Sequence, residues 1–255
     1  MPVAHASEGN VITRLSSFFS HKPTRRVFAL GGVFAIVVLT AGCFDKEPEQ
    51  RKAFITFLQT RIIDRPGLRI PILSDKDISD LGPYADHYRV LNGFHHRLDT
   101  TISKDLQRAA QFGRPKSLEE LRSQRALIPV MTDTMAKLKA ELAKAEADAD
   151  AAHKSLKQPP DLKIVYDKAY ERMVTAPARL FRDLMPLVEA VLPPIGTLAA
   201  FLDDNRGTIE LKGNQIAVKN AAVRAKLAAL IDEVTKLGQA VTDGQRKLQA
   251  FATGR

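Results

Sequence analysis

Cys43, the single cysteine of this 255-residue chain, is the residue whose chemistry is easiest to predict. It follows Leu39-Thr40-Ala41-Gly42, so small side chains stand just before it, as a signal peptidase requires ahead of its cleavage site. A thiol at this position can accept a diacylglyceryl group in thioether linkage. The pattern predicts cleavage between Gly42 and Cys43 and lipid attachment at Cys43. With one cysteine no internal disulfide can form.

Three histidines, His87, His95 and His96, are the nearest approach to a metal site in the sequence. Two ligands on one helix should lie three or four residues apart, and these pairs do not have that spacing. His95 falls among apolar residues, where a hydrogen-bonded core histidine is expected. We therefore predict no metal and no cofactor.

Motifs for catalysis are missing from the sequence. It contains no His-Glu-x-x-His, no Gly-x-Ser-x-Gly, no glycine-rich phosphate loop and no cluster of cysteines. We predict no catalytic residues and a protein that is not an enzyme.

Residues 1–42 have the composition of a lipoprotein signal peptide. Basic residues that include Arg25 and Arg26 precede an uncharged apolar run, Val27–Leu39. The Arg25-Arg26 pair also resembles a twin-arginine export motif, which leaves general and twin-arginine export both open. The alternative is an uncleaved signal anchor, which would make a single-pass membrane protein with a periplasmic helical domain.

Export and lipidation together predict a protein anchored by lipid in the cell membrane or the outer membrane, facing the periplasm. The formal net charge is +9, but an exported protein does not routinely meet nucleic acid, so no nucleic-acid partner is expected. Basic residues such as Arg61, Arg122 and Arg125 are expected to face anionic lipid head groups or solvent.

Residues 43–255 are expected to form one helical domain. Apolar spacing predicts helices from Pro48 to Asp64, from a Ser74 cap to Gly113, and from a Ser117 capping box to about Lys157, with a break or kink at Pro129. A fourth helix follows Pro160, a fifth begins at Pro177, and a sixth follows an Asn220 cap. Alternation over residues 208–219, around Gly213-Asn214, predicts a β-hairpin.

Two of these helices carry coiled-coil seams, which are expected to pair with each other. The first seam is Leu121, Ile128, Met135, Leu142, Ala149 and Leu156, and the second is Val223, Leu227, Leu230, Val234, Leu237, Val241, Leu248 and Phe251. The predicted fold class is mainly α: an elongated bundle of long helices with coiled-coil seams and one small β-hairpin. The apolar stretch Leu184–Leu202 contains three prolines and is predicted to be a buried helix, not a membrane span.

The residues around Cys43 carry a resemblance to a known family. The run Gly42-Cys43-Phe44-Asp45-Lys46-Glu47, with Gln50–Ile55 and Phe57-Leu58-Gln59, resembles the start of the mature YiaF-like lipoproteins, a bacterial family of unknown function. The segments Ala151-Ala152-His153 and Thr175-Ala176-Pro177 are similar to the family's middle part. The resemblance implies a membrane-attached envelope lipoprotein and supplies no activity and no catalytic residues.

Three classes of function follow from these observations. The leading hypothesis is a non-enzymatic, lipid-anchored bundle that presents a helix face to another envelope protein. The competing class is a carrier or sensor of an apolar ligand, held in a cavity between the fifth helix and the hairpin. An envelope hydrolase has no nucleophile and base pair to support it.

Overall fold

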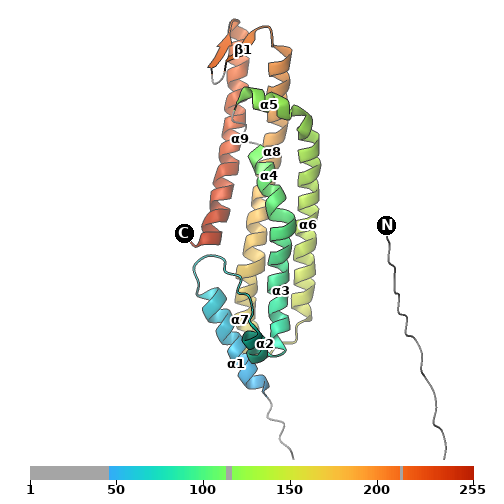
Figure 1. Cartoon of the computed structure of the whole chain (residues 1–255), viewed down its shortest axis with the longest axis vertical. Coiled ribbons are helices and arrows are strands. Elements are labelled where there is room, and N and C mark those ends of the chain that lie inside the picture. The colour runs from blue at the N-terminus through green and yellow to red at the C-terminus, as the bar shows by residue number, and fades with distance from the viewer. Residues whose placement is uncertain (1–45, 113–116, 213–214) are drawn as a thin grey trace, which may run out of the picture. The chain divides into compact units, whose positions relative to one another are not determined.

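Long helices lying side by side make up the body of the protein (Figure 1). The computed structural model describes residues 46–112, 117–212 and 215–255, which all fall in the unit Phe44–Arg255. The elements are α1 (Glu47–Leu58), η1 (Gln59–Ile63), α2 (Asp75–Leu81), α3 (Tyr84–Arg97), η2 (Leu98–Ser103), α4 (Lys104–Phe112), α5 (Leu118–Gln124), η3 (Arg125–Leu127), α6 (Ile128–Ser155), α7 (Pro160–Tyr170), η4 (Glu171–Thr175), α8 (Ala176–Asp204), β1 (Ile209–Lys212), β2 (Gln215–Val218) and α9 (Ala221–Thr253). The predicted mainly-α fold with one small hairpin is confirmed.

Helix α8 lies at the centre of the packing. It contacts α6, α5 and α9, while α3 and α4 pack on α6 (Figure 1). The prediction that the two heptad seams pair with each other is wrong: α6 buries its seam against α3 and α8, and α9 buries its seam against α8. Glu189 is the only charged residue between Leu184 and Leu202, so α8 offers apolar surface to both seams at once.

The helix predicted from Ser74 to Gly113 is interrupted. Ser74 caps α2 as expected, by accepting a hydrogen bond from the Asp77 amide, but α2 ends at Leu81. Gly82 then adopts a φ of +54°, and a Cβ there would lie 2.3 Å from the Gln50 side chain of α1. Because Gly82-Pro83 turns the chain at this close contact, α3 begins as a separate helix.

The α-helix α8 begins at Ala176, next to Pro177 as the sequence predicts, but no break separates it from α7. Helical residues run without a break from Pro160 to Asp204, and the π-helical turn η4 joins α7 to α8. Proline lacks an N–H group, so Pro177 cannot donate to the carbonyl of Met173 four residues earlier. The wider hydrogen bonds of η4 accommodate this missing donor within a continuous helix.

This 45-residue helical run is long and apolar enough to cross a membrane, judged by length and composition alone. In the fold its apolar side chains pack against neighbouring helices and form much of two hydrophobic clusters. The larger cluster joins α1, α3, α6, α7 and the first part of α8. The smaller one joins the rest of α8 to α5, β1 and α9. The predicted core side chains of the first helix, Phe54, Phe57, Leu58 and Ile62, are all buried.

The predicted hairpin is present, and β1 pairs antiparallel with β2 in a register that places Ile209 opposite Val218. The predicted turn at Gly213-Asn214 lies outside the described residues. Ile209 is buried against α8 and α9, whereas Ile216 is 43% exposed. Among the described hairpin side chains, Ile209 therefore packs on the helices and Ile216 does not.

We expect Gly67→Ala to loosen the C-terminal end of α9. Gly67 has a φ of +70°, a Cβ there would lie 2.6 Å from the Ala252 carbonyl oxygen, and the Leu68 amide donates to that same oxygen at 3.0 Å. Backbone strain and the clash should together cost roughly 2 kcal/mol. Hydrogen exchange of the amides at 248–253 should speed up. Gly93→Ala is the control, since a Cβ at Gly93 meets nothing within 4 Å and alanine favours a helix.

Candidate functional site

The residues predicted for export and lipidation, Arg25, Arg26, Gly42 and Cys43, lie outside the described residues. The first described helix, α1, begins at Glu47, four residues after Cys43. Its first turn is tied to two other helices, because Glu47 accepts a hydrogen bond from Tyr84 of α3 and Arg51 pairs with Asp161 of α7 at 3.5 Å. The start of α1 is thus fixed within the bundle.

The three histidines lie on α3 and do not converge. His87 is half-buried, with its Nδ1 3.1 Å from the Gln158 side-chain nitrogen, and its burial lowers its pKa. His95 is buried, and His96 is exposed. In the part of the chain that the structure describes, no group of three or more His, Cys, Asp or Glu side chains is placed to hold a metal ion.

His95 is a core histidine, as expected. The backbone of Met173, four residues before Pro177, lies close enough to the His95 ring to raise the pKa of that ring in part. Within the described residues its Nε2 has no hydrogen-bond partner, and burial lowers the pKa of His95 to about 4. The buried ring of His95 is therefore neutral at neutral pH.

A polar network links the end of α6 to α7. The Tyr170 hydroxyl donates to Asp150 at 2.6 Å, and the His153 ring stacks on Tyr170 with centroids 4.1 Å apart. Nε2 of His153 lies 2.9 Å from Asp167. Each side chain is held by another member, so the network clamps the α6–α7 connection. Sequence analysis missed it because the partners are 14 to 20 residues apart.

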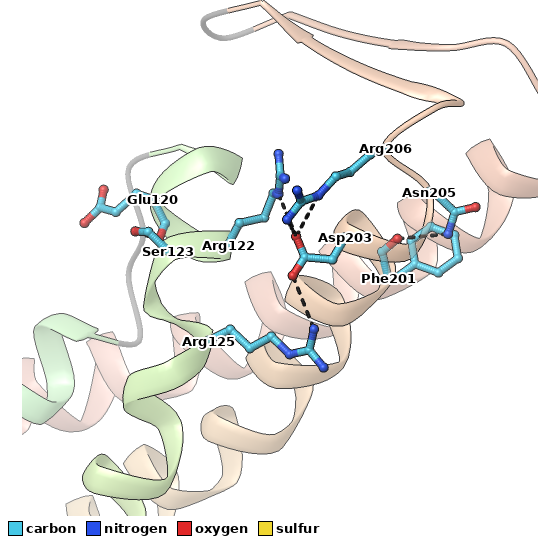
Figure 2. Close-up of polar contacts among 8 residues, drawn as sticks. All are labelled: Glu120, Arg122, Ser123, Arg125, Phe201, Asp203, Asn205 and Arg206. Atoms are coloured by element: carbon cyan, nitrogen blue, oxygen red, sulfur yellow. Dashed lines mark hydrogen bonds and ion pairs between the residues drawn. The ribbon is translucent and has the colours of Figure 1, made fainter.

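Three arginines converge on Asp203 at the other end of the continuous helix (Figure 2). Arg122 of α5 donates through Nε to Oδ1 at 3.1 Å, and Arg125 of η3 donates through Nη1 to Oδ2 at 3.2 Å. Arg206, in the turn after α8, donates through Nη2 to Oδ1 at 2.8 Å and through Nε at 3.3 Å. We call Asp203 and these three arginines the Asp203 cluster.

The cluster carries more positive than negative charge. Hydrogen bonds from Arg206, Arg122 and Arg125 together lower the pKa of Asp203 to about 2, so its carboxylate is ionised throughout the physiological range. Three guanidinium groups then share one carboxylate, which leaves a formal excess of two positive charges. The Glu120 side chain points away from the three arginines in Figure 2.

Arg122 and Arg125 were expected to face lipid head groups or solvent. Both pair with Asp203, a residue 78 to 81 positions away in the chain, and Arg125 is also exposed to solvent. Of the three arginines, only Arg206 lies near Asp203 in the sequence, three residues after it. The cluster fastens the short α5 to the end of α8.

Comparison with known proteins places the chain in a family. A model of a protein family of unknown function, DUF3053, matches residues 31–249. The chain belongs to the DUF3053 family. The matched region includes Cys43 and every described element through most of α9.

Curated relatives of the chain are also of unknown function. The chain is 34% identical over 169 residues to the uncharacterised protein YiaF of Escherichia coli K12, and equally to YiaF of Shigella flexneri; the alignment covers 66% of this chain and 71% of each relative. These matches confirm the resemblance to YiaF-like proteins. No solved structure matches the chain.

Proposed function

We propose that the protein is a lipid-anchored component of the bacterial envelope whose helical body works by binding another envelope protein, without catalysis. The observation that carries the proposal is the run Leu39-Thr40-Ala41-Gly42-Cys43, in which the single thiol of the chain follows small residues at the end of an apolar segment. Anchoring would place the body in the periplasm, at the cell membrane or the outer membrane.

The start of α1 supports a body held close to the membrane. A chain spans at most about 3.6 Å per residue, so the four residues from Cys43 to Glu47 reach no more than about 14 Å. Because Arg51 pairs with Asp161, α7 also begins at the anchored end. From there the helix Pro160–Asp204 rises 1.5 Å per residue over 45 residues, which carries the Asp203 cluster about 67 Å along the bundle.

A binding role fits the described surface better than catalysis does. The titratable side chains that come together around His153 are arranged as a clamp between α6 and α7. The ligand-carrier alternative expected a cavity between α8 and the hairpin. A described pocket of about 250 Å³ lies between α6 and α8 and is lined by residues that include Leu142, Met185 and Pro186.

Metabolic labelling with a palmitate analogue tests the anchor. Wild-type protein should incorporate the label and have a mass that corresponds to cleavage before Cys43, while Cys43→Ala should abolish labelling and accumulate an unprocessed precursor. Arg25→Lys with Arg26→Lys is the companion variant, and it should leave labelling intact unless export requires the twin-arginine pair. Labelling and processing that survive Cys43→Ala would exclude the lipoprotein function.

A further inference from the structure

The guanidinium groups of the Asp203 cluster have more hydrogen-bonding capacity than Asp203 uses. Each arginine carries five N–H donors, and the described contacts to Asp203 engage one nitrogen each of Arg122 and Arg125 and two of Arg206. The side chains of Arg125 and Arg206 are 51% and 66% exposed, whereas that of Asp203 is 22% exposed. The accessible side of the cluster is therefore cationic.

The excess charge selects a class of ligand. Planar guanidinium forks match the oxygens of phosphate and carboxylate groups, and two unneutralised positive charges are best balanced by a dianion. A phosphate monoester carries about −1.5 to −2 charges near pH 7, whereas a phosphate diester or a single carboxylate carries about one. We propose that the Asp203 cluster binds a dianionic phosphate group, either free phosphate or the terminal phosphate of a lipid that lies outside the anchoring membrane, which is about 67 Å away.

Three different elements hold the arginines, and this pre-organises the site. Arg122 comes from α5, Arg125 from η3 and Arg206 from the turn after α8, and Asp203 fixes one edge of each guanidinium (Figure 2). Asp203 also competes with the phosphate, because both are anions at the same three cations. This competition distinguishes a binding site from a structural clamp.

Thermal unfolding of the full-length protein, purified from membranes in a non-ionic detergent, tests the proposal. Inorganic phosphate is titrated at constant ionic strength set with sodium chloride. The wild-type melting temperature should rise and saturate, and Arg125→Gln with Arg206→Gln should abolish the rise. Arg182→Gln is the matched control: Arg182 is 53% exposed and pairs with Glu146 at 2.7 Å on α6, so its loss should leave the response intact.

The Asp203→Asn variant distinguishes a clamp from a binding site by its stability with and without phosphate. A clamp alone predicts a less stable protein with no response to phosphate. The proposed site predicts that this variant is less stable without phosphate and is rescued by it, with a half-saturating concentration roughly tenfold lower than that of wild type, because a competing charge has gone. If the variant does not accumulate, broadening of the phosphorus NMR line of inorganic phosphate by wild type, lost in the double arginine variant, makes the same test at 25 °C.

Soluble short-chain lipids separate the two sources of phosphate. Dihexanoyl phosphatidic acid has a phosphate monoester, and dihexanoyl phosphatidylglycerol has a diester. Stabilisation at lower concentrations by the first lipid than by inorganic phosphate would assign the site to a lipid head group, and equal potency would assign it to free phosphate. Equal effects of the two lipids, or a phosphate response that the double arginine variant retains, would overturn the proposal.

Discussion

Leu142→Asp is expected to remove at least 5 kcal/mol of folding free energy, enough to unfold most of the protein at 25 °C. Leu142 is 1% exposed and lies in the larger hydrophobic cluster, where α6 packs on α8. Truncating a buried leucine costs about 2–5 kcal/mol, and the new carboxylate would be buried without a cationic partner. Small domains are stable by only about 5–15 kcal/mol. Urea unfolding followed by circular dichroism measures the loss.

Ala140→Asp is the matched control, since it adds the same carboxylate to α6 at an exposed position. We expect its free energy of unfolding to stay within about 1 kcal/mol of wild type, most of it the lower helix propensity of aspartate. Lys139 is less suitable as a control because it pairs with Glu189 of α8 at 3.1 Å. Equal urea midpoints for Leu142→Asp and Ala140→Asp would show that this face of α6 is not buried.

Acidification from pH 6.5 to pH 4 is expected to destabilise the fold through His95. Burial lowers the pKa of His95 from an ordinary value of 6.5 to about 4, against the opposing effects of Asp99 and the Met173 backbone. Between pH 6.5 and pH 4, His95 is therefore protonated in the unfolded chain but neutral in the folded chain. The free energy of unfolding has its full value above pH 6.5. As the pH is lowered from 6.5 to 4 it falls by about 1.4 kcal/mol per pH unit, roughly 3 kcal/mol in total.

We would isolate this effect by measuring unfolding free energies at pH 7, 5.5 and 4.5. The proteins compared are wild type, His95→Gln and His96→Gln. Glutamine keeps an N–H donor for the Met173 carbonyl and does not titrate, so His95→Gln should lose most of the pH dependence above pH 4.5. His96 is exposed, and its replacement should leave the dependence unchanged. The same pH slope in wild type and His95→Gln would contradict a buried, neutral His95.

Local sequence signals predicted most of the helix starts. Ser74, Ser117 and Asn220 cap their helices as expected, because a cap depends on residues within one turn. The pairing of the seams could not be predicted in the same way. An amphipathic helix shows that it has a buried face without showing which neighbour covers that face, and here the almost uncharged α8 covers two of them.

The candidate site shows the same limit. Arg122, Arg125 and Asp203 each resemble an ordinary surface charge, and only the packing of α5 on the end of α8 brings them together. The surroundings of His95 also depend on a distant residue, because Met173 lies 78 positions away in the chain. Interactions that close loops of about eighty residues leave no periodic trace in the chain.

The π-helical turn η4 has an evolutionary consequence. Its hydrogen bonds reach one residue further than those of an α-helix, so Glu171–Thr175 is equivalent to an α-helical segment with a single inserted residue. A relative that lost one residue here would close the wide turn into ordinary α-helix and keep the faces of α7 and α8 in register. Leu162 and Tyr166 would then stay in the core. The same deletion elsewhere in this helix would rotate α7 by about 100° against α8, so η4 is the place in the helix where a change of one residue in length does least harm.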